Sequence, residues 1–188
     1  MPKPTLQVIV ASTRPRRVGP AVADYLVRRI GERGGFEIEL LDLAEIDLPL
    51  LDEPHHPRLG RYEHAHTKAW SATISRGDAY LIVMPEYNHS FNAALKNALD
   101  YLSAEWVGKP VALASYGGIS GGTRAAAALT EVLITLGLIV SRAAVAIPMV
   151  QTHITDGRFT GYPAVDQAID TLYGSLVDLT AKTALTRS

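Results

Sequence analysis

Short apolar runs alternate along the chain with longer segments in which apolar residues recur at helical spacing. The apolar runs predict five strands, at residues 6–11, 36–41, 79–84, 111–115 and within 143–147. The remaining periodic segments predict five helices, at residues 20–33, 62–75, 93–103, 122–136 and 162–184. Most strands are almost continuously apolar, as strands covered on both faces must be. The pattern therefore predicts an α/β protein with a central parallel sheet and helices on both faces.

One connection interrupts this regular alternation. Residues 42–60, between the second strand and the second helix, are rich in proline, aspartate and histidine and are too long for an ordinary connection. We expect this segment to be a functional or interface loop. The chain has 188 residues and no internal repeat, linker or low-complexity tract, so the sequence predicts one domain over residues 1–188.

Composition narrows the chemistry that the chain can perform. The absence of cysteine excludes disulfides, iron–sulfur ligation and a thiolate nucleophile, so redox chemistry would need a bound cofactor. Lys and Arg total 18 against 19 Asp and Glu, and no polybasic run gives an electrostatic footprint for nucleic acid or a membrane surface. No apolar run approaches the roughly 20 residues of a membrane-spanning helix, and the first residues lack a signal-peptide pattern, so we expect a cytoplasmic protein.

The loop after the first predicted strand carries the parts of a phosphate site. Ser12 and Thr13 supply hydroxyls, three arginines follow them, and the start of a helix attracts an anion. Gly19 permits close approach of the backbone. The loop lacks both the Walker A ending and the G-x-G-x-x-G fingerprint, so a phosphate monoester fits better than ATP or a dinucleotide. The alternative is a helix cap beside solvated arginines.

The loop after the third predicted strand is polar and aromatic. Pro85 fixes the backbone, Tyr87 offers a ring face, and Asn88 can cap a helix or bond the edge of a heterocycle. Because ligands of open parallel sheets bind outside the carboxyl ends of the strands, these residues point to a planar ligand. Packing for stability is the alternative. Glu86 could act as a general base, but a capping or solvent-facing role is favoured for a single acid in a loop.

The loop after the fourth predicted strand is rich in glycine. Ser115 and Tyr116 are followed by Gly117, Gly118, Gly121 and Gly122, and an alanine-rich helix begins there. Backbone without side chains can approach a flat ligand closely, while the serine and the tyrosine supply polar contacts. A flexible turn before a capped helix is the alternative. Three such loops at one edge of a sheet favour a shared ligand pocket.

Other polar and aromatic residues give weaker signals. Asp42 imitates the ribose-binding acid of a dinucleotide-binding domain, but without the glycine fingerprint a loop cap is favoured. Trp70 is expected in the core. A possible metal cluster is formed by His55, His56, His64 and His66. Residues 64 and 66 are expected on different sides of a helix, and loop histidines are usually solvated, so no metal site is predicted.

Ordered motifs along nearly the whole chain resemble those of the NAD(P)H-dependent FMN reductases, a flavodoxin-like family that includes quinone, chromate and azo-dye reductases. The motifs are Ser12-Thr13-Arg14 with Gly19, Pro85-Glu86-Tyr87-Asn88 with Leu95-Lys96-Asn97-Ala98-Leu99-Asp100, Trp106-Val107-Gly108-Lys109-Pro110, and Ser115-Tyr116-Gly117-Gly118. The resemblance implies a five-stranded parallel sheet in the order 2-1-3-4-5 with helices on both faces. It also implies FMN as cofactor.

The resemblance assigns the three loops to parts of FMN. The phosphate would be held by Ser12, Thr13, Arg14, Val18 and Gly19. The isoalloxazine ring would be lined by Pro85, Glu86, Tyr87 and Asn88, with Ser115, Tyr116, Gly117 and Gly118 at its other edge. Many relatives carry a serine where Arg17 stands, so Arg17 would either grip the phosphate or meet NADPH. Relatives often have proline near Phe91 or Asn92, and its absence bears on the shape of the ring pocket.

The resemblance further implies an enzyme that takes hydride from NAD(P)H and passes electrons to a quinone, free flavin or similar small acceptor. No catalytic acid or base is required, because the cofactor carries the chemistry. The alternatives are a non-enzymatic FMN electron carrier and a flavin-based sensor. Electron carriers are usually strongly acidic for docking to partners, so the net charge of -1 disfavours the carrier. Relatives form dimers or tetramers, so a homodimer or homotetramer is expected.

Overall fold

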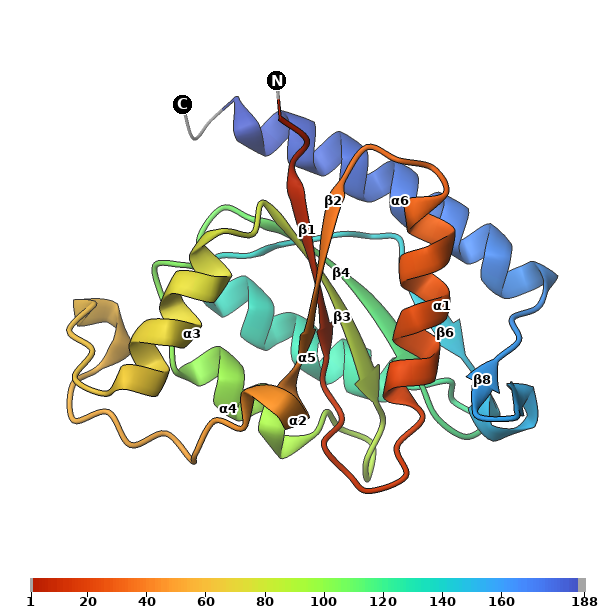
Figure 1. The fold of residues 1–188 in the computed structure, drawn as a ribbon, viewed down its shortest axis with the longest axis horizontal. Coiled ribbons are helices and arrows are strands. Elements are labelled where there is room, and N and C mark those ends of the chain that lie inside the picture. Colours follow the sequence, from red (N-terminus) through yellow and green to blue (C-terminus); the bar gives the residue numbers. More distant parts are fainter. Residues whose placement is uncertain (1, 186–188) are drawn as a thin grey trace.

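A parallel sheet forms the centre of the molecule in a computed structural model that describes residues 2–185 (Figure 1). Its strands are β1 (Thr5–Val10), β2 (Glu37–Asp42), β3 (Ala79–Pro85), β4 (Pro110–Tyr116), β5 (Ile139–Val140) and β6 (Val145–Ile147). They run in the order β2-β1-β3-β4-β5, with β6 also paired to β4, and all of these pairs are parallel. The predicted fold class and the order 2-1-3-4-5 are thereby confirmed.

The fifth position of the sheet is shared by two short strands. Ile139 pairs with the start of β4 and Val145 with its end, so β5 and β6 follow one another along the same edge. Between them, the Ser141 hydroxyl donates to the carbonyl oxygen of Ala143 at 3.0 Å and interrupts the ladder. The sequence predicted only the second of these strands, because two residues are too few to show a pattern.

Six α-helices accompany the sheet in the described chain. They are α1 (Gly19–Gly31), α2 (Leu43–Ile46), α3 (Ala65–Ser75), α4 (Ala93–Asp100), α5 (Thr123–Thr135) and α6 (Pro163–Ala184). Five of them match the predicted helices, although α3 begins three residues later and α4 ends three residues earlier than expected. No helix within residues 2–185 is long and apolar enough to cross a membrane.

Short elements lie in two of the connections. The segment 42–60 contains α2 and the 3₁₀ helix η1 (Pro57–Leu59), which periodicity did not reveal. A second 3₁₀ helix, η2 (Val150–His153), follows β6 and leads into a small antiparallel hairpin of β7 (Ile154–Thr155) and β8 (Arg158–Phe159). These elements are too short to produce a helical or alternating pattern, so they could not be predicted from the sequence.

Two apolar cores lie on opposite faces of the sheet. One core joins α1 and α6 to the sheet, and the other joins α3, α4 and α5 to it (Figure 1). All seven residues of β3 and of β4 are buried, as expected for central strands covered on both sides. Trp70 is 2% exposed and its indole N–H donates to the carbonyl oxygen of Ala98, so its predicted place in the core is confirmed.

The topology brings the loops of interest to one edge. Because the strands of the central sheet are parallel, the segments after β1, β3, β4 and β6 all leave from the carboxyl ends of neighbouring strands. In Figure 1 the segment between β1 and α1 lies at the lower edge of the molecule. The sheet therefore collects four connections, far apart in sequence, at one place.

Candidate functional site

A cleft of about 430 Å³ opens at the carboxyl ends of the strands. Its volume lies within the roughly 300–1,000 Å³ that small-molecule and cofactor sites occupy. Nine of the fourteen predicted site residues line it. They are Arg14, Arg17 and Val18 after β1, Pro85, Glu86 and Tyr87 at the end of β3, and Tyr116, Gly117 and Gly118 at the end of β4. The structure thus brings together the three loops that the sequence singled out.

The other five predicted residues do not line this cleft. Thr13 borders a second, smaller cavity between α2 and α4, while Ser12, Gly19 and Ser115 are buried behind the wall. Asn88 lies in the turn after β3. These residues can shape the cleft without forming its surface.

The start of α1 packs tightly against two hydroxyl groups. A Cβ placed on Gly19 would lie 2.5 Å from the Ser12 Oγ and 2.8 Å from the Tyr116 hydroxyl. Both oxygens are buried, and neither forms a hydrogen bond of standard geometry with a described residue. Burial raises the pKa of Tyr116 to about 12, and the nearby Ser12 hydroxyl opposes this shift. Two buried hydroxyls thus pack directly behind the helix start, where an anion such as a phosphate would be attracted.

The segment between β1 and α1 leaves its amides available. Within residues 2–185, the backbone amides of Thr13, Arg14, Arg16 and Arg17 donate no hydrogen bond. Helix α1 has no acidic residue in its first turn, and its N-cap residue Val18 makes no side-chain cap. The positive end of the helix is therefore uncompensated. This arrangement fits a phosphate monoester, as the sequence predicted.

Arg17 is engaged within the protein. One of its nitrogens, Nη1, donates to Asp42 Oδ1 and, at 2.6 Å, to the carbonyl oxygen of Ser12, while Nη2 donates to Asp42 Oδ2 at 2.7 Å. The hydrogen bonds to Asp42 raise the pKa of the Arg17 guanidinium, which stays charged. Asp42 also accepts from the Ala44 amide at 3.0 Å and so caps α2. The predicted capping role of Asp42 is confirmed.

The loop after β3 turns sharply and presents an aromatic ring. Asn88 and His89 have φ values of 50° and 66°, and the backbones of Tyr87 and Ser90 exchange two hydrogen bonds of 2.9 Å across them. Asparagine tolerates this left-handed conformation, so Asn88 contributes to the backbone of the turn. The Tyr87 ring lines the cleft, and the guanidinium carbon of Arg14 lies 5.6 Å from the ring centroid. The ring is held where a planar ligand could meet it.

The entry to α4 is fixed without proline. Asn92 is the N-cap residue of α4 and is 5% exposed. Its Nδ2 donates to the carbonyl oxygen of Ala11 at 2.6 Å, joining the turn after β3 to the end of β1. A hydrogen bond between neighbouring loops therefore positions the start of this helix.

Glu86 caps a helix. Its carboxylate accepts from the Ser120 hydroxyl at 2.9 Å, the Arg124 amide at 3.1 Å and the Arg124 guanidinium at 3.2 Å, at the start of α5. Burial alone would raise the pKa of Glu86, but the hydrogen bonds from Ser120 and Arg124 outweigh it and the pKa lies below its ordinary value. Such an acid is a poor general base, and the capping role favoured by the sequence is confirmed.

Glu86→Gln is therefore expected to retain the rate of NAD(P)H oxidation within about twofold while lowering the melting temperature. Because the folded-state pKa lies below the ordinary value of 4.5, the stabilisation is complete above that pH and declines as the pH falls through the folded-state pKa. The difference in melting temperature between wild type and variant should then shrink in acid. Glu131→Gln, on an exposed position of α5, is the control. A difference that is the same at pH 4 and pH 7 would contradict this account.

The glycine loop after β4 is held by the Ser115 side chain, at the end of that strand, and by the segment after β6. Ser115 donates from Oγ to the carbonyl oxygen of Gly121 at 2.9 Å, so its hydroxyl supports the loop. The carbonyl oxygens of Gly117 and Gly118 accept from the amides of Val150 and Met149 at 3.1 and 2.8 Å. The two loops form one rigid wall of the cleft.

This wall contains residues that sequence reasoning missed. The cleft is also lined by Met149, Val150, Gln151 and Thr152, which come almost directly after β6. The sequence located the last strand, and the carboxyl-end rule applies to it as to the others. The available signal was therefore the position of residues 148–152 directly after a predicted strand, which no glycine or charge cluster emphasised.

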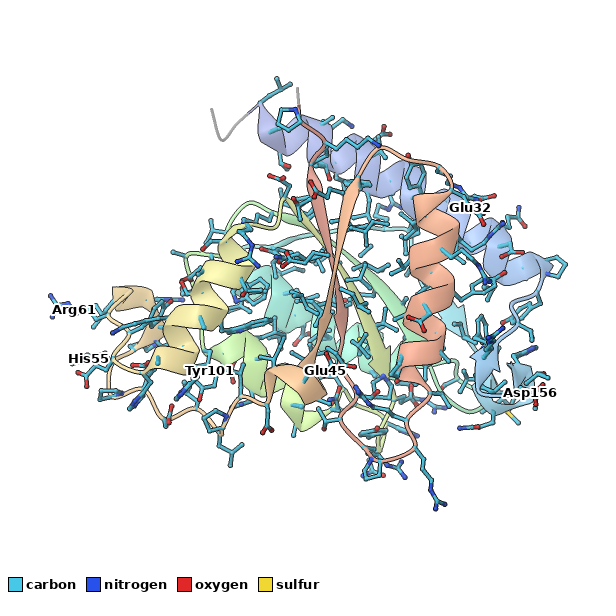
Figure 2. The ribbon with its side chains drawn as sticks, viewed as in Figure 1. Glu32, Glu45, His55, Arg61, Tyr101 and Asp156 are labelled. Atoms are coloured by element: carbon cyan, nitrogen blue, oxygen red, sulfur yellow. The ribbon has the colours of Figure 1, made fainter. Side chains whose placement is uncertain are left out.

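His64 and His66 lie beside each other at the start of α3, and neither lines the cleft; the labelled His55 lies at the periphery of the molecule in Figure 2. The rings of His64 and His66 stack with centroids 5.2 Å apart, so the expectation that they point to different sides of a helix was wrong. Helix α3 begins at Ala65, and His64 therefore has extended backbone. His66 Nε2 lies 2.9 Å from Asp52 Oδ1. Among the described residues, no group of three or more His, Cys, Asp or Glu side chains is arranged to hold a metal ion.

The fold has known counterparts. Flavodoxin from Streptococcus pneumoniae TIGR4 superposes with a TM-score of 0.58 over 93% of this chain and 98% of that chain, at 8% sequence identity. The flavoenzyme FerB from Paracoccus denitrificans, described as an NAD(P)H:(acceptor) oxidoreductase, superposes with a TM-score of 0.75 at 25% identity. That alignment covers 96% of this chain and 98% of FerB. The chain therefore has a flavodoxin-like fold with a mononucleotide-sized cleft.

Sequence comparison gives the family. Residues 4–152 match the family NADPH-dependent FMN reductase, and the chain belongs to this family. An NAD(P)H-dependent FMN reductase from Schizosaccharomyces pombe is 43% identical over 122 residues, which are 63% of this chain and 60% of that protein's length. A second, from Saccharomyces cerevisiae, is 35% identical over 154 residues, which are 76% of this chain and 80% of that protein. An NADPH azoreductase from Bacillus sp. is 36% identical over 124 residues, or 64% of each chain.

Proposed function

We propose that this protein binds FMN in the cleft, takes hydride from NAD(P)H and passes electrons to a small acceptor. The observation that carries the proposal is that one cleft combines an uncompensated helix start and free amides with an aromatic ring and a glycine backbone. A phosphate fits the first set of groups and a flat heterocycle fits the second. FMN has both parts.

Each wall of the cleft has a separate task in this proposal. The segment 12–18 and the start of α1 hold the phosphate through backbone amides and the positive end of the helix. Pro85 and Tyr87 flank the isoalloxazine ring on one side, and the backbone of Gly117 and Gly118 approaches it on the other. FMN, when bound, supplies the acceptance and release of electrons. The protein orients the two substrates and excludes water, and no side chain is assigned as a catalytic acid or base.

The relatives' names support a small acceptor. Besides the azoreductase, an NADPH:quinone oxidoreductase of Arabidopsis thaliana is 36% identical over 107 residues, which are 55% of this chain and 53% of that protein. We propose quinones, free flavins or azo compounds as acceptors of this protein too. Such molecules can reach the bound ring because the cleft is open to solvent.

The oligomeric state and the cellular compartment of the protein are part of the same proposal. We propose a single domain over residues 1–188 that acts in the cytoplasm as a homodimer or homotetramer. Leu50, Leu51 and Leu59 are exposed on the long loop, which supports a role for that loop in an interface between copies. Sedimentation velocity of the wild type and of a Leu50→Ser variant would test it, since loss of the interface lowers the sedimentation coefficient.

Titration of the apoprotein with FMN tests the function directly. We expect binding of one FMN per chain, a yellow protein, and bleaching by NADPH without oxygen that is reversed by a quinone. Binding of FMN without reduction by either nicotinamide nucleotide would favour the electron carrier or the sensor. A protein that gains no absorbance from FMN would contradict the proposal.

A further inference from the structure

Arg17 stands in the predicted phosphate loop, yet its hydrogen bonds point into the protein. The Arg17 side chain is 18% exposed, and the side chain of Asp42, which it meets, is 11% exposed. Both carboxylate oxygens of Asp42 accept from it, and Nη1 also donates to the carbonyl oxygen of Ser12 at 2.6 Å. A bidentate pair with a third hydrogen bond, mostly shielded from water, defines one geometry for the side chain.

These contacts join two neighbouring strands beyond their ends. Val10, the last residue of β1, pairs with Asp42, the last residue of β2. Arg17 lies seven residues after Val10 and returns to that point, so its side chain closes the segment 11–17 into a loop whose base is the Ser12 carbonyl. Asp42 is itself held, because its carboxylate caps α2 through the Ala44 amide. The loop is thereby tied to a fixed part of the sheet.

The charges of the loop are divided between two roles. The charge of Arg17 is compensated by Asp42, and Glu45 on α2 adds to the negative surroundings (Figure 2). Arg14 and Arg16 are exposed at the cleft, and neither forms an ion pair within residues 2–185. Arg14 and Arg16 can therefore attract a phosphate at the cleft, whereas Arg17 would first have to leave a carboxylate.

We propose that Arg17 is a positioning residue, which acts with Asp42 to hold the free amides of Thr13, Arg14 and Arg16 in place for the phosphate of a mononucleotide. The inference rests on the proposed function, because it takes FMN as the ligand. It separates this chain from relatives that carry serine at this position. The sequence left two roles open for Arg17, which were to grip the FMN phosphate or to meet NADPH. The proposed positioning role differs from both, because it needs no contact with either nucleotide.

Two substitutions test the pairing. Arg17→Met removes the guanidinium but keeps an unbranched side chain, and Asp42→Asn removes one charge while retaining an oxygen that can cap α2. If the pair positions the loop, each variant should bind FMN about tenfold more weakly in a fluorescence titration, and the double variant no more weakly than either single one. If Arg17 instead leaves Asp42 to bind the phosphate, Asp42→Asn would bind FMN as tightly as wild type or more tightly. That result would overturn the proposal.

Riboflavin lacks the phosphate, so its affinity distinguishes a loss of phosphate positioning from a general disruption of the cleft. Its affinity is expected to stay within twofold of wild type in all three variants, because the ring wall does not depend on the pair. A parallel loss of FMN and riboflavin affinity would show a merely structural role and overturn the proposal. Glu32→Gln removes an exposed carboxylate paired with Arg29 at the far end of α1 (Figure 2) and is the matched control. It should leave both affinities unchanged.

Thermal unfolding of the apoprotein shows whether Arg17→Met folds. If it does not fold, the conservative variant Arg17→Lys provides the test instead. Arg17→Lys retains the charge, but a single ammonium group cannot reproduce the bidentate pair and the bond to Ser12 together. We expect about tenfold weaker FMN binding for this variant as well. Full FMN affinity in Arg17→Lys would overturn the proposal. Failure of the proposed function gives a different result, because the wild type itself would then bind no FMN.

Discussion

Gly19→Val is expected to abolish FMN binding, with at least a hundredfold loss of affinity. A Cβ on Gly19 would lie 2.5 Å from the Ser12 Oγ, 2.8 Å from the Tyr116 hydroxyl and 3.2 Å from a side-chain carbon of Val10. The neighbours would have to move, and with them the two unsatisfied hydroxyls and the start of α1. The amides at the start of α1 are the groups proposed to meet the phosphate. Equilibrium titration with FMN, followed by flavin fluorescence, measures the loss.

The matched control is a second glycine of the same helix. A Cβ on Gly31, the last residue of α1, meets only one atom within 4 Å, an Ile38 side-chain carbon at 3.9 Å. Gly31→Ala is therefore expected to bind FMN as wild type does. Retention of FMN affinity by Gly19→Val would mean that the phosphate lies elsewhere, and the site would have to be reassigned.

Gly122→Ala is expected to lower the free energy of unfolding by about 3 kcal/mol. Gly122 has a φ of 84°, which alanine adopts only with strain, and its added Cβ would lie 2.7 Å from both the Ser115 Cβ and the Tyr116 amide nitrogen. The second of these is backbone of a central, buried strand and cannot easily move. For a chain of this length, we expect the melting temperature to fall by about 10 °C. Thermal and urea unfolding followed by circular dichroism would measure the effect.

Gly118→Ala, in the same loop, is the control for this change. A Cβ at Gly118 would meet no atom within 4 Å, and its φ is not in the left-handed region. Stability is expected to stay near that of wild type, although the added methyl group faces the cleft. Equal destabilisation by the two substitutions would show that the loop responds to any side chain, and the close approach at Gly122 would not be the cause.

The main elements could be predicted from the sequence because their signals are local. Strands β3 and β4 are apolar at nearly every position, and the periodic segments of α1, α4 and α5 end at or near glycine or a polar residue. The capping role of Asp42 was also available, since this acid stands directly before a helix start. The error at His64 and His66 came from a helix boundary three residues too early, which changes the face that each side chain occupies.

The remaining features of the site depend on contacts between distant residues. The bonds from Arg17 to Asp42 span 25 residues, and the wall formed by residues 149–152 meets the glycine loop about 30 residues earlier in the chain. No local pattern specifies which loop a long arginine will turn toward. A strand of two residues such as β5, and a 3₁₀ helix such as η2, likewise leave no periodic signal.

The sequence by itself determined the α/β class, the central strands and the three loops that form most of the cleft. It did so because burial on both faces demands continuous apolar strands, and because parallel strands deliver their following loops to one edge. Only the tertiary structure decided that Arg17 is bound by Asp42, that Glu86 caps α5, and that the segment after β6 closes the cleft. Those outcomes depend on which charged and polar groups become neighbours after folding, and that is fixed by the packing of the whole sheet.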